Sequence, residues 1–193
     1  MSLDDLPLTS AWRHEGAREG FEAVTVRRLE TGGQLEGAST AVQAGEAWAI
    51  AYRIAFDARW VTRQARIWGW STGGSQARLL ESDGAGRWRV DGRDQPALDG
   101  CLDVDLEASA STNTLPVHRL GLEVGAASAA PAAYVRAVDF GVERLEQTYT
   151  RLEDDGPRRR YMYRAPVFEF QAVLAYDRAG LVLDYPGIAT RAL

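Results

Sequence analysis

GCLDVDLEASASTNTLPVHRL, residues 100–120, is the stretch of sequence that decides the fold. Its first part, 101–107, alternates leucine or valine with cysteine or an acidic residue, which is the period-two pattern of a β-strand. The short polar side chains at 111–114 can cap a helix, and Pro116 fits a first helical turn because that turn tolerates a missing N–H. The stretch therefore predicts a strand, a capped turn and a short helix.

Outward from this stretch, most of the chain shows the same period-two alternation. The clearest case is 46–56, where five large apolar side chains alternate with residues that are mostly alanine. Strand patterns bounded by turn residues recur roughly ten times along the chain, and the spacing typical of βαβ units is absent. The sequence therefore predicts a mostly β protein with an antiparallel sheet.

Three tryptophans lie in, or directly before, the strand that follows at 61–71. The alternation assigns Trp60, Trp68 and Trp70 to one face, and three large rings on one face need an apolar neighbour or an apolar ligand. We therefore regard Trp68 and Trp70 as candidate ligand-binding residues.

Two hairpins far apart in the chain share a pattern. Residues 54–61, IAFDARWV, align with residues 174–181, LAYDRAGL, so that each strand ends in an aromatic residue and an aspartate-led turn. One interpretation is a sheet with two pseudo-symmetric halves. The other is that any two strands joined by an aspartate turn look alike, and the sequence leaves both open.

Length and charge limit the class of protein. A chain of 193 residues with 46% hydrophobic content can bury one sizeable core, so we expect a single domain over residues 1–193. The net charge of −5 argues against nucleic acid, because phosphates favour a basic surface. The start of the chain, MSLDDLPLTSAW, lacks the basic and apolar regions of a secretory signal, and no run approaches the ~20 apolar residues of a membrane span. We therefore expect a cytoplasmic protein with no integral membrane segment.

The composition also limits metal and cofactor chemistry. Cys101 is the only cysteine, so it forms no internal disulfide, and with two histidines in the chain a zinc site is not expected. Asp103, Asp105 and Glu107 share one strand face and could ligate a hard cation, although pairing with arginines or solvation competes with that interpretation. We expect neither a metal nor a cofactor.

A short motif offers one enzymatic alternative. Residues 69–73, GWSTG, fit the G-x-S-x-G pattern of serine hydrolases, and an aspartate of 103–105 and His118 follow in the hydrolase order. The motif requires a strand before it and a helix after it, whereas the alternation at 76–81 predicts a strand. We therefore expect the end of a hairpin here and no catalytic residue, and keep a serine hydrolase as an alternative.

Residues CLDVDL at 101–106, TNTLP at 112–116 and RL at 119–120 resemble the signature of a bacterial glycolipid-binding family. Looser similarity extends over most of the chain, although Ala110 stands where the family pattern has a proline. The resemblance implies a spiral β-roll, a long curved sheet wrapped around a single short helix, and a homodimer.

The resemblance and the double-sided apolar strand at 46–56 lead to one functional hypothesis. We expect the concave side of the curled sheet to bind a lipid-like or glycolipid amphiphile without transforming it. The candidate ligand-binding residues are Trp68, Trp70, Asp103, Asp105, Asn113, His118 and Arg119. The alternative is a structural or homodimerising protein that buries its tryptophan face between two copies. A histidine beside a helix more often hydrogen-bonds a neighbouring carbonyl, so His118 also has a purely structural interpretation.

Overall fold

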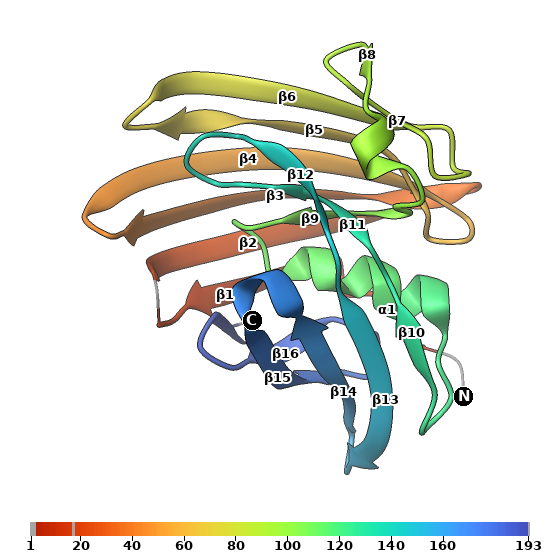
Figure 1. The fold of residues 1–193 in the computed structure, drawn as a ribbon. Helices are drawn as coiled ribbons and strands as arrows, with labels where there is room; N and C mark the ends of the chain where they lie inside the picture. Colours follow the sequence, from red (N-terminus) through yellow and green to blue (C-terminus); the bar gives the residue numbers. More distant parts are fainter. Residues whose placement is uncertain (1–2, 17, 193) are drawn as a thin grey trace.

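The computed structural model describes residues 3–16 and 18–192, and most of these residues belong to one long curved sheet (Figure 1). Within the described residues the sheet has 14 strands, and each strand runs antiparallel to its neighbours. In spatial order they are β10 (Ala127–Ala129), β13 (Thr148–Asp155), β14 (Arg158–Ala165), β15 (Phe170–Tyr176), β16 (Val182–Tyr185), β17 (Ala189–Arg191), β1 (Thr9–His14), β2 (Arg18–Leu29), β3 (Gly32–Gln43), β4 (Glu46–Asp57), β5 (Thr62–Ser71), β6 (Gly74–Ser82), β7 (Trp88–Val90) and β8 (Arg93–Asp94). The predicted mostly β, curled antiparallel sheet is confirmed.

A smaller sheet and a helix occupy the hollow of the large sheet (Figure 1). The smaller sheet contains β12 (Val142–Leu145), β11 (Ala132–Val135) and β9 (Asp103–Leu106). The 3-10 turn η2 (Ser111–Asn113) continues into α1 (Thr114–Leu120), and two further 3-10 turns are η1 (Pro96–Leu98) and η3 (Pro166–Phe168). Strands β9 and β11 are parallel and are connected through α1, so one crossover unit accompanies the antiparallel sheet.

The large side chains of β4 face the hollow. Trp48, Tyr52 and Ile54 are fully buried, whereas the alanines of the same strand are half-buried or exposed on the outer, convex face. Gly37, opposite Tyr52 on β3, leaves room for this ring, because a Cβ there would lie 2.5 Å from the Tyr52 Cζ atom. The face of large residues therefore forms the core, as expected for a sheet that curls around a helix.

A buried carboxylate holds the helical segment in the roll. Glu22 of β2 accepts hydrogen bonds from the Tyr52 hydroxyl at 2.5 Å, the Ala110 backbone N–H at 2.7 Å and the Ser109 hydroxyl. The Ser111 hydroxyl lies 2.9 Å from the Tyr52 hydroxyl and extends the network. Because hydrogen bonds to a charged acceptor are among the strong ones, this network fixes the turn that precedes α1.

The predicted capping of the helix is wrong. No side chain caps α1, because the polar residues before it make tertiary hydrogen bonds instead. The Thr112 hydroxyl donates to Asp105 at 2.9 Å, and Asn113 Oδ1 accepts from the Tyr149 hydroxyl at 2.7 Å. The turn therefore attaches the helix to β9 and β13.

Several elements lie where the sequence pattern is weak. The start of the chain contains β1, where Trp12 is fully buried and donates its indole N–H to the Val182 carbonyl at 2.8 Å. Residues 125–133 contain β10 and the start of β11, and small alanine and serine residues hide the alternation there. Residues 142–153 fall in two strands, β12 and β13, which belong to different sheets.

Two hairpin turns of the large sheet share one hydrogen-bond pattern. In the β4–β5 turn the Asp57 N–H donates to the Val61 carbonyl at 3.0 Å, and the Val61 N–H donates to Asp57 Oδ1 at 3.1 Å. In the β15–β16 turn Asp177 and Leu181 make the same two bonds, both at 2.9 Å. A register shift accompanies each turn. The sequence similarity of these hairpins therefore extends to the geometry of their turns.

Candidate functional site

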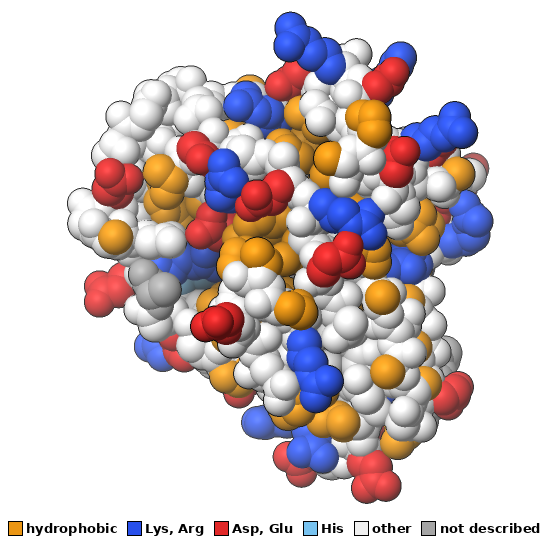
Figure 2. Space-filling model, in the orientation of Figure 1, with side chains coloured by type: hydrophobic (Ala, Val, Ile, Leu, Met, Phe, Trp, Pro, Cys, Tyr) orange, Lys and Arg blue, Asp and Glu red, His pale blue; other side chains and the backbone are white. Residues whose placement is uncertain are grey.

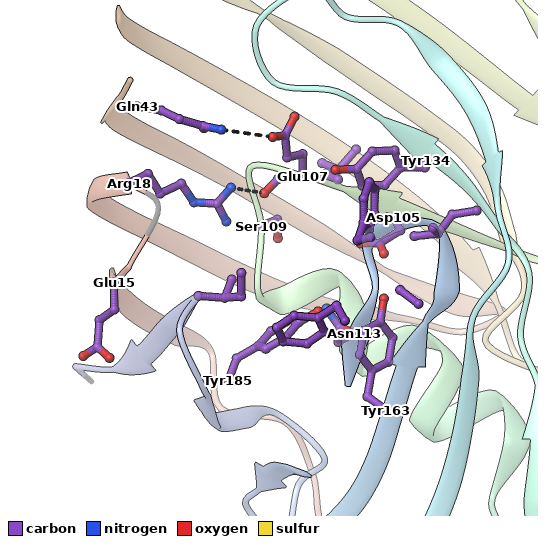
Figure 3. Close-up of a pocket in the computed structure, with 16 residues that line it drawn as sticks. Glu15, Arg18, Gln43, Asp105, Glu107, Ser109, Asn113, Tyr134, Tyr163 and Tyr185 are labelled. Atoms are coloured by element: carbon purple, nitrogen blue, oxygen red, sulfur yellow. Dashed lines mark hydrogen bonds between the residues drawn. The ribbon is translucent and has the colours of Figure 1, made fainter. Parts of the chain in front are cut away.

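A cavity of about 220 Å³ lies on the concave side of the roll, between the helical segment, β9, β11 and the strands β14 to β16 (Figure 3). Pockets that enclose a drug-sized ligand have volumes of ~300 Å³ or more. The cavity therefore matches a small headgroup rather than a complete amphiphile.

One wall of the cavity is aromatic. The Tyr163 and Phe170 rings each lie with their centroid 5.8 Å from the Tyr185 centroid, and Tyr134 lies 5.5 Å from Phe168. The contacts of Tyr185 with Tyr163 and Phe170 are edge-to-face, a favoured geometry for buried rings. The wall presents a broad apolar surface with phenolic hydroxyls at its edge.

Polar residues of β9 and of the segment between β9 and α1 also line the cavity (Figure 3). Asp105 is buried, and burial raises its pKa to about 6, although the hydrogen bond from Thr112 opposes that shift. The buried Asn113 amide also lines the cavity, and its Oδ1 atom accepts a hydrogen bond from the Tyr149 hydroxyl. The two predicted site residues Asp105 and Asn113 therefore line the same cavity.

A buried arginine completes the polar side. Arg18 donates to the Glu107 carbonyl oxygen, while the Glu107 carboxylate accepts from the Ala137 N–H at 2.8 Å and from the Gln43 side chain at 3.4 Å. Among the described residues, Arg18 Nε and Gln43 Oε1 are buried without a hydrogen-bond partner. An unsatisfied buried polar atom costs ~1–3 kcal/mol, so this corner of the cavity would gain from a further polar partner.

His118 lies at the far end of α1, in a separate cleft. Its Nε2 atom is 2.8 Å from the Ala179 carbonyl oxygen, and its ring stacks on Trp60 with centroids 3.8 Å apart. Burial lowers the pKa of His118 to about 4, so the ring is neutral at physiological pH. These contacts agree with the structural interpretation of His118.

Asp103 and Arg119 form a buried ion pair behind the cavity. Arg119 donates from Nε to Oδ1 of Asp103 at 2.9 Å and from Nη2 to Oδ2 at 2.6 Å. This two-pronged geometry occupies both groups and joins β9 to α1. Neither residue lines the cavity.

The two outer tryptophans lie on the convex face of the sheet, opposite the cavity. Trp68 is 39% exposed and Trp70 is 52% exposed, whereas Ile67, which points to the other face of the same strand, is buried. The prediction that Trp60 shares their face is wrong, because the register shift at the end of β4 and the turn direct its ring against Phe56 and His118. Ligand binding by Trp68 and Trp70 stays a prediction.

The G-x-S-x-G motif ends a hairpin, as the alternation predicts. Ser71 is the last residue of β5, its hydroxyl donates to the Val138 carbonyl at 2.7 Å, and the strand β6 follows it. A nucleophile elbow requires a helix at this point. The surroundings of Ser71 therefore differ from those of a hydrolase serine.

Sequence reasoning missed most of the cavity wall. Arg18, Tyr134 and Tyr163 come from β2, β11 and β14, which meet only because the sheet curls. The alternating aromatic residues of 161–170 were the one available signal, since they predict an inward aromatic face.

Comparisons with known proteins agree with this architecture. A family model described as "Putative glycolipid-binding" matches residues 9–191. The crystal structure of a DUF1089 family protein from Pseudomonas aeruginosa superposes with a TM-score of 0.75 and 34% sequence identity, covering 99% of this chain and 96% of that chain. Among curated proteins no relative matches the chain. In the part of the chain that the structure describes, no helix has the length and apolar character needed to cross a membrane.

Proposed function

Because the chain belongs to the glycolipid-binding family, whose model it matches over residues 9–191, we propose that its concave cavity binds the sugar headgroup of an amphiphile without transforming it. One observation supports the proposal above all. Aromatic rings and buried hydrogen-bonding groups together line a cavity of headgroup size.

The chemistry of a sugar ring matches a lining of aromatic rings and hydrogen-bonding groups. A pyranose has an apolar C–H face, which packs on aromatic rings such as Tyr163 and Tyr185, and a rim of hydroxyls, which need both donors and acceptors. Asp105 supplies an acceptor, and Asn113 and Arg18 supply donors. The charges favour an uncharged sugar, since among the described residues the lining carboxylates Glu15, Asp105 and Glu107 outnumber the one lining cation, Arg18, and would repel a phosphate.

Of the residues named from sequence, we retain Asp105 and Asn113 as headgroup contacts. Asp103 and Arg119 position β9 against α1, and His118 packs at the other end of the helix. Arg18, Tyr163 and Tyr185 join the proposed site.

Calorimetry with a panel of methyl glycosides tests the headgroup site. The panel contains the methyl glycosides of glucose, galactose, mannose and N-acetylglucosamine. At least one should bind, and Asp105→Asn should weaken it about tenfold, because a hydrogen bond to a charged group contributes ~1.5–3 kcal/mol. Asp139→Asn, at an exposed aspartate, is the matched control. Failure of the whole panel to bind, or unchanged affinity in Asp105→Asn, would refute the proposal.

A second proposal concerns the convex face. Phe21, Trp68 and Trp70 are 59%, 39% and 52% exposed there, and Thr40 and Ala49 lie between Phe21 and Trp70 in the cross-strand register. Large apolar side chains exposed on one face of a sheet are typical of an interaction surface, so we propose that two copies of the chain associate through this face. Sedimentation analysis should give a dimer for the natural chain and a monomer for Trp70→Glu, with Val124→Glu as a control elsewhere on the surface. A monomeric natural chain overturns this proposal.

We further propose that residues 1–193 form one domain and that the protein acts in the cytoplasm. A single calorimetric unfolding transition, with equal van't Hoff and calorimetric enthalpies, supports the first statement. Cell fractionation with a protein-specific antibody tests the second.

A further inference from the structure

We propose that the alkyl chain of the bound amphiphile leaves the cavity over the η3 turn, Pro166–Phe168, with Val167 as its outer contact. This inference rests on the proposed headgroup site. A cavity of about 220 Å³ is smaller than pockets that enclose a drug-sized ligand, so an alkyl chain attached to the bound sugar would extend along the surface at the cavity mouth.

The most exposed apolar side chains at the cavity mouth lie on the η3 turn. Phe168 lines the cavity and is also 50% exposed, and the neighbouring Val167 is 69% exposed. Across the mouth lie Glu15, Arg18 and Gln43, whose charged and polar groups would have to be desolvated under an alkyl chain. Hydrophobic side chains also gather near the middle of the face that Figure 2 shows. The η3 turn therefore offers the most exposed apolar exit for the alkyl chain.

The backbone of the η3 turn is constrained at both ends. Pro166 restricts the backbone at the start of the turn, and Glu169 ends it with φ +50° and an N–H bond to the Pro166 carbonyl at 2.9 Å. Contact between the Phe168 and Tyr134 rings joins the turn to the cavity wall. A rigid turn presents an apolar surface without an ordering cost on binding, which favours a ligand contact.

The dependence of glycoside affinity on the length of the alkyl chain tests this exit. We would measure methyl, hexyl and octyl glycosides of the sugar that binds best in the panel, all below their micelle concentrations. Full burial of a methylene contributes ~0.8 kcal/mol, about fourfold in affinity, so a half-covered chain should gain about twofold per carbon in the natural protein. Val167→Glu should lower octyl glycoside affinity at least fivefold and leave methyl glycoside affinity unchanged. Val124→Glu, the same change at a valine on another exposed surface, should alter neither.

The possible outcomes separate the inference from the headgroup site. If the methyl glycoside binds and the octyl glycoside binds no tighter, the exit is wrong and the headgroup site stands. If no methyl glycoside binds, the headgroup site itself fails. If Val167→Glu leaves the length dependence intact but abolishes sedimentation with phosphatidylcholine vesicles, the turn contacts a bilayer and the inference is overturned.

Discussion

Trp60 and Gly180 occupy the same position in two matching turns, and both turns contact His118. Their φ angles are +66° and +80°, in the left-handed region that favours glycine. A bulky residue in this region costs ~1–3 kcal/mol. Stacking of Trp60 on His118, at 3.8 Å, and on Phe56, at 4.4 Å, offsets that strain. The two turns together therefore hold the last turn of α1.

Gly180→Ala should destabilise the protein strongly. A Cβ at this position would lie 2.7 Å from His118 Nε2. The alanine would also have to adopt the left-handed backbone conformation of Gly180, with φ +80°. We expect a loss of ~3 kcal/mol in the free energy of unfolding, the sum of left-handed strain and overpacking. Gly156→Ala is the matched control, because Gly156 has φ +58° but nothing within 4 Å of its Cβ position. Equal losses in urea unfolding of the two variants would contradict a contact with His118.

Glu22→Gln should loosen the turn before α1. The amide keeps one acceptor oxygen, which the Ala110 N–H requires, so the Tyr52 and Ser109 hydroxyls lose the charged acceptor of their hydrogen bonds. We expect the free energy of unfolding to fall by ~2–4 kcal/mol, since a buried charged hydrogen-bond partner is lost. Urea unfolding measures this loss. Glu36→Gln, which removes an exposed ion pair with Arg53, should have a far smaller effect. A similar response of the two variants would refute the positioning role of Glu22.

The elements that sequence predicts well are those whose pattern is local. The strand at 46–56 was predictable because one face carries only large residues, and that face is the core. The segment 111–120 was predictable as a turn and a helix because a polar run precedes Pro116. The hydrogen bonds of this segment were not predictable, because Thr112 and Asn113 bond to partners on strands elsewhere in the chain. No local pattern can specify such partners.

The cavity was largely unpredictable for the same physical reason. Asp105 and Asn113 belong to the stretch that already looked functional, and they do line the cavity. The aromatic wall comes from strands that are distant in sequence and meet through the curl of the sheet. Trp60 and Trp68 lie on different faces of the sheet because of one register shift. A slip of one residue reverses the face of every later side chain.

Acid should destabilise the protein between pH 6.5 and 4 through its two histidines. Burial lowers the pKa of both His14 and His118 to about 4, so the unfolded chain binds protons over this range and the folded chain does not. Each histidine thus removes up to ~1.4 kcal/mol of stability per pH unit as the pH falls. Urea unfolding of the natural protein and of His118→Gln at several pH values measures this slope. An unchanged slope in the variant would show that His118 contributes nothing.

Over part of that pH range, Asp105 should reduce the loss of stability that the two histidines cause in acid. Its pKa is raised to about 6 in the fold, so between its unfolded value of 3.8 and about 6 the folded chain binds the additional proton. Protonated Asp105 therefore stabilises the fold in acid, and this stabilisation is lost as the pH rises through 6. We expect Asp105→Asn to steepen the acid loss between pH 6 and 4, measured by the same urea titrations, while Asp155→Asn, at an exposed aspartate, leaves it as in the natural protein. A shallower loss in Asp105→Asn would reverse the sign and contradict a raised pKa.

Glycoside binding should weaken as Asp105 becomes protonated. An ionised carboxylate accepts hydroxyl hydrogen bonds about twice as strong as a neutral acceptor does, so the affinity for a methyl glycoside should fall between pH 7.5 and 5. The pKa of about 6 puts the midpoint of this change near pH 6, and a loss of ~1 kcal/mol corresponds to about fivefold in affinity. Calorimetry at several pH values would follow the change, with circular dichroism to establish that the protein is folded throughout. Asp105→Asn carries no titrating group at this position and should bind weakly with a flat profile. If its affinity falls with acid as steeply as that of the natural protein, another group controls binding and Asp105 is not the acceptor.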